Sequence, residues 1–273
     1  MNESLEDGLE QMLARYHRGD QLVLLFGYDG ALTKLSVRPW QAELSPATRR
    51  VLTGLSVLPR VTVGIISGRE LGQLKRLVGV SSIFYAATDG LELEFRGKTV
   101  THPLVNHTAP LLGEVAKALE PHIRDFPTAW IERKHFGVTV HYRQLDPRLV
   151  PQLHVRIDRE LDAWGERLHV VTGAKAVEIT PSLGWTKGTA VEFVLQQLGP
   201  HPCLVLYAGD EASDVEALWN VSVHSGITIG IGSRQPTVAQ FELPDVEAVK
   251  ELLDHLCHEL SVGSPPASAR PAV

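Results

Sequence analysis

The chain has little cysteine, no excess of basic residues and no long apolar run, and each of these absences excludes a class of protein. Its 273 residues include two cysteines, Cys203 and Cys257, whose spacing suits neither a metal site nor a disulfide framework. The net charge of −6 argues against nucleic acid or an anionic membrane as an obligate partner. No apolar run approaches the roughly 20 residues that span a bilayer, and the acidic N-terminus shows no secretory signal. We therefore expect a soluble cytoplasmic protein.

What the chain does contain is ample material for a core, since 44% of its residues are hydrophobic. Short β-branched runs alternate with amphipathic segments, which predicts a parallel sheet buried on both faces. A hairpin is expected at 91–102. The other expected strands are 22–26, 61–66, 83–87, 203–208 and short ones within 221–231, and the expected helices are 4–17, 46–57, 70–78, 187–198, 212–219 and 245–260.

The pattern changes between residues 106 and 181, where an α-β-β-α-β-β order with alternating apolar and polar residues predicts an antiparallel sheet. Here we expect helices at 109–121 and 148–164 and strands at 128–133, 137–142, 168–171 and 175–179. The fold class is therefore α/β, a doubly wound parallel-sheet core interrupted by a small α+β cap. The predicted division is 1–105 and 182–260 for the core, 106–181 for the cap and 261–273 for a disordered Pro/Ala/Ser tail.

Polar side chains follow several of the predicted parallel strands. Asp29 follows the first strand, Ser67 the second, and Asp210 and Asp214 follow the strand at 203–208, while Lys187 opens a helix. Ligands of open parallel sheets gather at the carboxyl ends of the strands, so these side chains are expected to meet. Taken singly, each has a simpler interpretation as a helix cap or a surface charge. Their common order and placement favour one site.

The residue types suit a phosphorylated ligand and a metal ion. The Ser67 hydroxyl and the backbone at Gly68 can bind phosphate oxygens, and Lys187 can neutralise charge on a phosphoryl group. Three acids lie within residues 210–214, where they repel one another unless a cation joins them. Carboxylate oxygens are the ligands that Mg²⁺ prefers.

In order and context these motifs resemble those of the haloacid-dehalogenase-like (HAD) phosphatases, and over residues 21–255 those of the trehalose-6-phosphate phosphatase branch. The branch-specific likeness lies in Gly90-Leu91-Glu92, Val140-His141-Tyr142-Arg143 and the segment 173–179, although Thr88-Asp89 departs from the usual Asn-His or Ser-His. The resemblance implies a HAD-like core, a cap, Mg²⁺, and hydrolysis of trehalose 6-phosphate in trehalose biosynthesis.

The resemblance also implies that Lys175, Glu178, Arg143 and Glu92 bind the hydroxyls of the sugar. Charged side chains do this well through charge-assisted hydrogen bonds. The competing interpretation is a solvated sheet face, and Arg143 and Glu92 fit it equally well. His141 lies in an apolar strand and is expected to be structural.

The first motif departs from the resemblance at its most important position. In relatives, an aspartate there attacks phosphorus and ligates magnesium, and here that position is Gly27. Asp29, the expected acid/base, lies roughly 6–7 Å further along an extended strand and cannot replace it. Ala31 also replaces the usual threonine. The resemblance then leaves magnesium to the carbonyl oxygen of Asp29, to Asp210 and to Asp214, with the site weakened or lost.

Three hypotheses follow for the activity. In the first, the protein is an active phosphatase that uses bound water. In the second, it is an inactive relative that binds a sugar phosphate, either as a sensor or as a regulatory partner of a trehalose-phosphate synthase. In the third, it is a structural protein with a decayed pocket. Retention of most of the motif residues argues against decay. We predict a trehalose-6-phosphate phosphatase-like protein whose activity is strongly impaired, and the sequence leaves open whether it is an enzyme.

Overall fold

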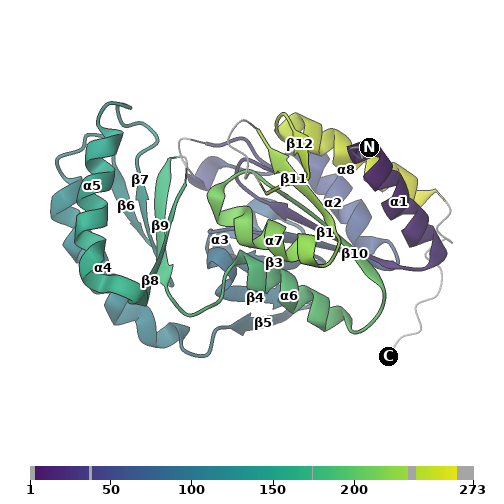
Figure 1. Ribbon diagram of the computed structural model, residues 1–273, viewed down its shortest axis with the longest axis horizontal. Helices are drawn as coiled ribbons and strands as arrows, with labels where there is room; N and C mark the ends of the chain where they lie inside the picture. Colours follow the sequence, from purple (N-terminus) through teal and green to yellow (C-terminus); the bar gives the residue numbers. More distant parts are fainter. Residues whose placement is uncertain (1–3, 37–38, 174, 233–237, 263–273) are drawn as a thin grey trace.

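The computed structural model describes residues 4–36, 39–173, 175–232 and 238–262 and contains two sheets that lie side by side (Figure 1). The larger sheet consists of β1 (Gln21–Gly27), β2 (Val61–Ile66), β3 (Phe84–Ala87), β4 (Glu92–Phe95), β5 (Lys98–Thr101), β10 (Cys203–Gly209), β11 (Ile227–Ile231) and β12 (Phe241–Leu243). Their order is β12-β11-β10-β1-β2-β3-β4-β5, parallel from β12 to β3 and antiparallel at β4 and β5. The predicted parallel-sheet core is confirmed.

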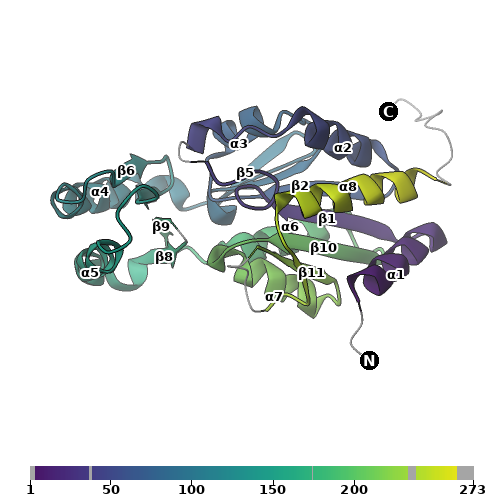
Figure 2. The ribbon, with the colours of Figure 1, turned by 90° about the horizontal axis from the view of Figure 1, so that it is seen from above.

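Helices cover both faces of this sheet because its central strands are apolar at successive positions. In β1, Leu22 and Leu24 face one apolar cluster, and Val23 and Leu25 face another. The first cluster is completed by α1 (Leu5–Arg18), α2 (Pro46–Val57), α3 (Leu71–Val78) and α8 (Val246–Ser261), and the second by α6 (Lys187–Leu198) and α7 (Val215–Val223). Figure 2 shows α2 and α3 on one side of the sheet and α7 on the other.

The second sheet is antiparallel throughout and has its own apolar cluster. It consists of β6 (Trp130–Arg133), β7 (Val138–His141), β8 (Leu168–Thr172) and β9 (Ala176–Pro181) in the order β6-β7-β9-β8, covered by α4 (Ala109–Ile123) and α5 (Val150–Leu161). Short 3-10 turns lie at Pro39–Gln41, Thr88–Gly90, Val105–Thr108, Asp162–Arg167 and Ala212–Asp214. The division of the chain into a core of residues 1–105 and 182–260 and a cap of residues 106–181 remains a prediction.

The turn between β6 and β7 holds the second sheet against the first. Phe136 is buried with Leu91 and Val105 of the larger unit. Next to it, Lys134 donates from Nζ to the carbonyl oxygen of Gly68 at 2.9 Å, and the His135 amide donates to Glu70 at 2.7 Å. Two polar contacts therefore join the second sheet to the segment that follows β2, and one apolar contact joins it to Leu91 and Val105.

The structure adds one strand that was not expected, β12, and departs from the expected elements in two further places. The helix expected at 148–164 ends at Leu161, and a 3-10 turn follows in which Gly165 has a φ of 54° and a ψ of −140°, incompatible with a helix. The strands expected from 221 begin only at Ile227, because Val221 packs into the core on α7.

Most of the expected tail, 263–273, lies outside the described residues. In the described part of the chain, no helix has the length and apolarity needed to cross a membrane.

Candidate functional site

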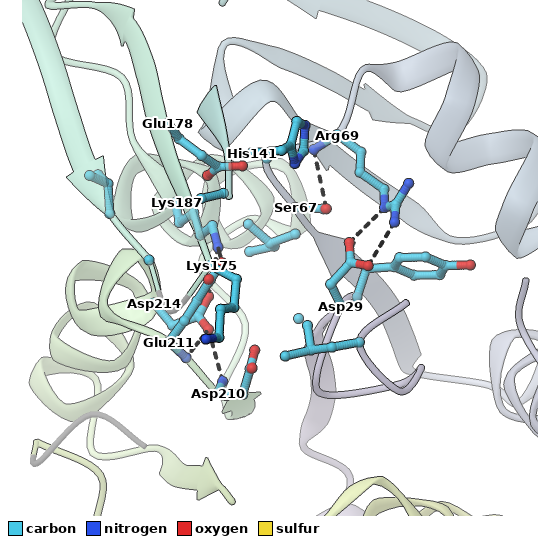
Figure 3. A pocket seen from close by; sticks show the side chains of 18 of the residues that line it. Asp29, Ser67, Arg69, His141, Lys175, Glu178, Lys187, Asp210, Glu211 and Asp214 are labelled. Carbon is cyan, nitrogen blue, oxygen red and sulfur yellow. Dashed lines mark hydrogen bonds and ion pairs between the residues drawn. The ribbon is translucent and has the colours of Figure 1, made fainter. Parts of the chain in front are cut away.

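A cleft lies where the carboxyl ends of β1, β2 and β10 face the second sheet (Figure 3). Parallel pairing brings these ends to one edge, with Gly27 beside Ile66 and Phe26 beside Ala208. The larger unit contributes Gly27, Asp29, Ser67, Gly68, Arg69, Lys187, Asp210, Glu211 and Asp214, and the second sheet contributes Glu132, Lys134, His141, Arg143, Lys175 and Glu178. The expected convergence of the motif residues is present in the structure.

The turn that follows β1 lies directly against the turn that follows β10. Gly30 has a φ of +77°, and a Cβ at this position would lie 1.9 Å from Oδ2 of Asp210. Only glycine therefore allows the backbone at residue 30 to approach this carboxylate. The contact places Asp210 beside the segment that carries Asp29.

Gly27, the last residue of β1, presents no side chain to the cleft. A Cβ built here would meet the Ala31 Cβ at 3.3 Å and the Ala208 carbonyl oxygen at 3.7 Å. The contact with Ala31 is tight and requires a small shift of that residue, the contact with Ala208 is ordinary, and the φ of Gly27 does not require glycine. The absence of a carboxylate at position 27 is thus a matter of residue identity rather than of space.

Asp29 is held by Arg69, which comes from the segment after β2. Arg69 Nε and Nη2 donate to Oδ2 and Oδ1 of Asp29, each at 2.6 Å (Figure 3). Burial of Arg69 favours its neutral form, but the hydrogen bonds and charge of Asp29 outweigh that and raise the pKa of Arg69. A bidentate pair of this kind has well-defined geometry and orients both side chains. Arg69 is therefore a site residue whose role, holding the carboxylate of Asp29, could not be read from the sequence pattern.

Ser67 is buried and its Oγ accepts the Arg69 amide at 3.3 Å. It does not cap the following helix, because the N-cap of α3 is Glu70. The structure therefore excludes the helix-cap interpretation of Ser67.

Lys187 is buried, so it is not a surface charge. Its Nζ lies 2.9 Å from Asp214 Oδ1, 2.5 Å from Ser213 Oγ and 3.6 Å from Glu211 Oε1. Burial opposes its charge, but Asp214 and then Glu211 and Asp89 raise the pKa of Lys187 well above its ordinary value. The ammonium group is a fixed positive charge at this end of the cleft.

Asp214 holds together the segment that follows β10. Its Oδ1 accepts from Lys187 and from the Tyr207 hydroxyl at 2.7 Å, and its Oδ2 accepts the Asp210 and Glu211 amides at 3.0 and 3.2 Å. A carboxylate offers about four acceptor positions, and here four donors use them. In this structure Asp214 positions Lys187 and the backbone of the acidic segment.

The residues present do not form a magnesium site built of carboxylates. Gly27 supplies no oxygen from a side chain, and Asp214 already has four donors. Both carboxylate oxygens of Asp29 accept from Arg69, so this residue could offer only its carbonyl oxygen. Over residues 4–36, 39–173, 175–232 and 238–262, no group of three or more His, Cys, Asp or Glu is arranged to hold a metal ion. Proteins usually hold Mg²⁺ through one or two carboxylates, with waters and substrate phosphate completing the octahedron, and the carboxylates of Asp29 and Asp214 are already used by other donors.

The second sheet brings Lys175, Glu178 and Arg143 to the cleft, but not Glu92 among the lining residues. Arg143 donates to the carbonyl oxygen of Ser36, across from the second sheet. Glu92 instead accepts from the Thr88 hydroxyl at 3.0 Å. Glu92 was expected either to bind sugar hydroxyls or to lie on the solvated face of a sheet, and its position outside the cleft lining favours the second interpretation.

Three further cleft residues come from the β6–β7 hairpin. Lys134 lies 3.6 Å from Glu178, and His141, expected to be structural, lines the cleft and lies 2.7 Å from Glu132. Burial opposes the charge of Glu132, and the hydrogen bond from His141 lowers the pKa of that carboxyl. The spacing of two residues between Glu132, in β6, and Lys134, just after it, is the only sequence signal that marks them.

The fold is that of solved haloacid-dehalogenase-like hydrolases. The trehalose-6-phosphate phosphatase C-terminal domain of C. albicans superposes with a TM-score of 0.83 at 24% identity, over 94% of this chain and 98% of that one. The C-terminal domain of the Candida albicans trehalose synthase regulatory protein superposes with a TM-score of 0.65 at 14% identity, over 88% and 95%. At these identities the likeness concerns the fold.

Sequence comparison assigns the chain more narrowly. It belongs to the trehalose-phosphatase family, whose model matches residues 25–247. It is 32% identical to the trehalose-phosphate phosphatase of Mycobacterium tuberculosis over 253 residues, which are 88% of this chain and 62% of that protein. The resemblance inferred from the motifs is thereby confirmed.

Proposed function

We propose that the cleft binds trehalose 6-phosphate, the compound after which the family is named. The observation that carries the proposal is the buried cation of Lys187 at one end of a cleft whose other wall bears Lys175, Glu178 and Arg143. Lys187 and Ser67 would hold the phosphate, and the charged groups of the second sheet would bind sugar hydroxyls. The separation of phosphate-binding and hydroxyl-binding groups matches the two ends of this ligand.

We propose further that hydrolysis is strongly impaired. Nucleophilic catalysis needs a side chain that can form a bond to phosphorus, and Gly27 has none at the position that the family resemblance assigns to the nucleophile. Asp29 does not replace it, because both of its oxygens are held by Arg69. For Asp29 to act as an acid or base toward a leaving sugar, one of those hydrogen bonds would have to open.

Family members of this kind generally rely on Mg²⁺, which would offset the charge of the transferring phosphoryl group. The donor set of this chain does not fit such an ion as it stands, and we derive no step through it. Lys187 remains as the charge that faces the phosphate.

A second candidate function is sugar-phosphate sensing, either alone or as a regulatory partner of a trehalose-phosphate synthase. Gly27 favours it, since the cleft retains cations for binding while lacking the nucleophile. The Candida albicans neighbour described as a trehalose synthase regulatory protein indicates that this fold also occurs in a protein named for regulation.

Binding and turnover measured on the same protein separate these functions. Calorimetry with trehalose 6-phosphate should give saturable binding that Lys187→Met abolishes, while phosphate release stays near background. Lys98→Met, in a hairpin away from the cleft, is the matched control and should bind normally. Absence of binding in the natural protein would refute the proposed ligand, and rapid phosphate release would refute the impairment.

A further inference from the structure

Two exposed indoles from different parts of the fold meet beside the cleft. Trp40 lies in the 3-10 turn Pro39–Gln41 of the larger unit, and Trp130 is the first residue of β6 in the second sheet. Their ring centres are 6.2 Å apart and their planes are inclined at 63°, so the two rings form a corner, called here the aromatic corner. Trp40 is 56% exposed and Trp130 is 37% exposed. Large aromatic side chains left open at the border of a cleft mark a binding surface.

Trp130 continues the wall that the second sheet presents to the cleft. Alternation along β6 places it on the same face as Glu132, which lines the cleft. His141, another lining residue, lies directly opposite Trp130 in β7 and stacks on its indole with ring centres 4.1 Å apart. Ile131 and Val140 face the other way, into the apolar cluster of the second sheet. Trp130 therefore belongs to the cleft face of this sheet and not to its core.

The segment that follows β1 is tied to the second sheet at two points. Arg143 donates to the carbonyl oxygen of Ser36, and Trp40 contacts Trp130. Arg143 and Ser36 both line the cleft. The aromatic corner is therefore continuous with the cleft, on the side where the larger unit and the second sheet approach each other.

The strand β6 measures how far the aromatic corner lies from the phosphate end of the cleft. Lys134, just after β6, donates to the carbonyl oxygen of Gly68 at 2.9 Å, next to the buried hydroxyl of Ser67. Trp130 comes four residues before Lys134, which is roughly 13 Å along an extended chain. Two linked pyranose rings span such a length, and one ring does not.

We propose that the aromatic corner binds the sugar ring that lies farther from the phosphate, through the apolar C–H face of that ring. This inference rests on the proposed function and deepens it, because it makes a second ring a requirement for tight binding. The cleft then selects a disaccharide phosphate over a phosphorylated monosaccharide. Trp40 and Trp130 are specificity-determining residues, and no covalent bond changes.

The chemistry of a pyranose ring fits this division of the surface. Its hydroxyl groups project from the rim of the ring, whereas its faces carry C–H groups, so it is bound best where polar groups adjoin an apolar surface. Glu132, Arg143 and Lys175 supply charged hydrogen-bonding groups in the cleft. The aromatic corner supplies the apolar surface next to them.

Calorimetry with trehalose 6-phosphate and glucose 6-phosphate tests the preference for two rings. Trp40→Leu and Trp130→Leu should each weaken binding of the disaccharide phosphate by roughly three- to tenfold and leave that of glucose 6-phosphate unchanged. Trp219→Leu, which removes an exposed indole on α7 outside the cleft lining, is the matched control and should change neither affinity. Trp130→Phe should retain most of the affinity because it keeps an aromatic face.

The two leucine variants also separate stacking on sugar from support of the cleft wall. Trp130 contacts His141, so its loss could disturb the wall, but Trp40 contacts Trp130 and leaves the His141 stack in place. Equal weakening of both ligands in both variants would show a merely structural role and overturn the proposal. So would unchanged affinity for trehalose 6-phosphate in both variants.

Saturation-transfer NMR with unphosphorylated trehalose distinguishes failure of this inference from failure of the proposed function. Irradiating the aromatic protons of the protein should transfer saturation to the C–H protons of trehalose. The transfer should persist in Lys187→Met and Trp219→Leu and be lost in the double variant Trp40→Leu/Trp130→Leu. If trehalose 6-phosphate fails to bind, the proposed function fails and this measurement decides the inference. Absence of transfer in the natural protein, or equal transfer in the double variant, then overturns it.

Discussion

Arg69 donates two hydrogen bonds of 2.6 Å to the carboxylate of Asp29, joining the segment after β2 to the turn after β1. The guanidinium is nearly buried and lies 5.3 Å from the centre of the Tyr28 ring, so three groups from two neighbouring strand ends form one rigid unit. In this unit Asp29 is oriented by Arg69 rather than directed freely into the cleft.

A double-mutant cycle with Asp29→Asn and Arg69→Gln should reveal strong coupling between the two residues. Each single variant leaves one charged side chain without the partner that makes two hydrogen bonds with it. We therefore expect a coupling of about 1–3 kcal/mol between the two substitutions in the free energy of unfolding. Urea denaturation of the four proteins measures it. A coupling near zero would contradict the role given to the pair.

Gly27→Asn and Gly27→Asp are matched in size and differ in nucleophilicity. A Cβ fits at position 27, so both variants should fold. Loss of a nucleophile in another enzyme class costs about 10⁶ in turnover. Gly27→Asp should therefore raise Mg²⁺-dependent phosphate release from trehalose 6-phosphate by at least about a hundredfold, a small part of that loss. Gly27→Asn should remain at the level of the natural protein, and equal rates in all three would show that position 27 does not limit turnover.

Gly30→Ala and Gly97→Ala separate backbone strain from collision. Both glycines have positive φ, +77° and +76°, but only at Gly30 would a Cβ strike Asp210. Gly97→Ala should cost about 1–2 kcal/mol of stability, the penalty for a left-handed residue. Gly30→Ala should cost more and weaken phosphate binding, as measured by thermal unfolding and calorimetry. Equal costs would mean that Asp210 moves aside freely.

Asp214→Asn should destabilise the fold strongly, since it removes one partner of a buried ion pair with Lys187. The expected loss is about 3–5 kcal/mol in the free energy of unfolding. Asp146→Asn, which breaks an exposed pair with Arg148, is the control and should leave the denaturation midpoint unchanged. If both substitutions have the same small effect, Asp214 does not hold the segment together.

The stability of the whole protein should depend on Asp89 in a defined pH range. Its pKa in the folded protein is raised to about 8 above the ordinary carboxyl value, so its protonation favours folding at acidic pH. That contribution is lost as the pH rises toward about 8, by up to about 1.4 kcal/mol per pH unit. Asp89→Asn should remove this slope from urea unfolding measured at pH 6, 7 and 8, and a slope unchanged in the variant would exclude Asp89 as its source.

The sequence predicts the central strands of the larger sheet well because they are buried on both faces, and runs such as Leu22–Phe26 leave little alternative, whereas the short edge strand β12 is missed. It predicts less well where two apolar patterns overlap. Val221 is equally suited to a strand and a buried helix face, and packing on α7 decides between them. The end of α5 depends on the backbone of Gly165, which apolar periodicity does not reveal.

For the cleft, the sequence identifies residues whose place follows from strand order. It misses residues that are far away in the sequence and are brought to the cleft by the folding of the second sheet. Ser67 and Asp210 lie at the ends of parallel strands, so topology places them. Lys134 reaches Gly68 only because a hairpin 66 residues away folds over it. The pairing of Arg69 with Asp29 is likewise a matter of side-chain direction, which no spacing rule encodes.

The room beside Gly27 has an evolutionary consequence. Glycine codons that end in a pyrimidine become aspartate codons by a single base change, and a Cβ at this position requires only a small shift of Ala31. A lineage carrying this fold can therefore gain or lose a carboxylate at position 27 in one mutational step.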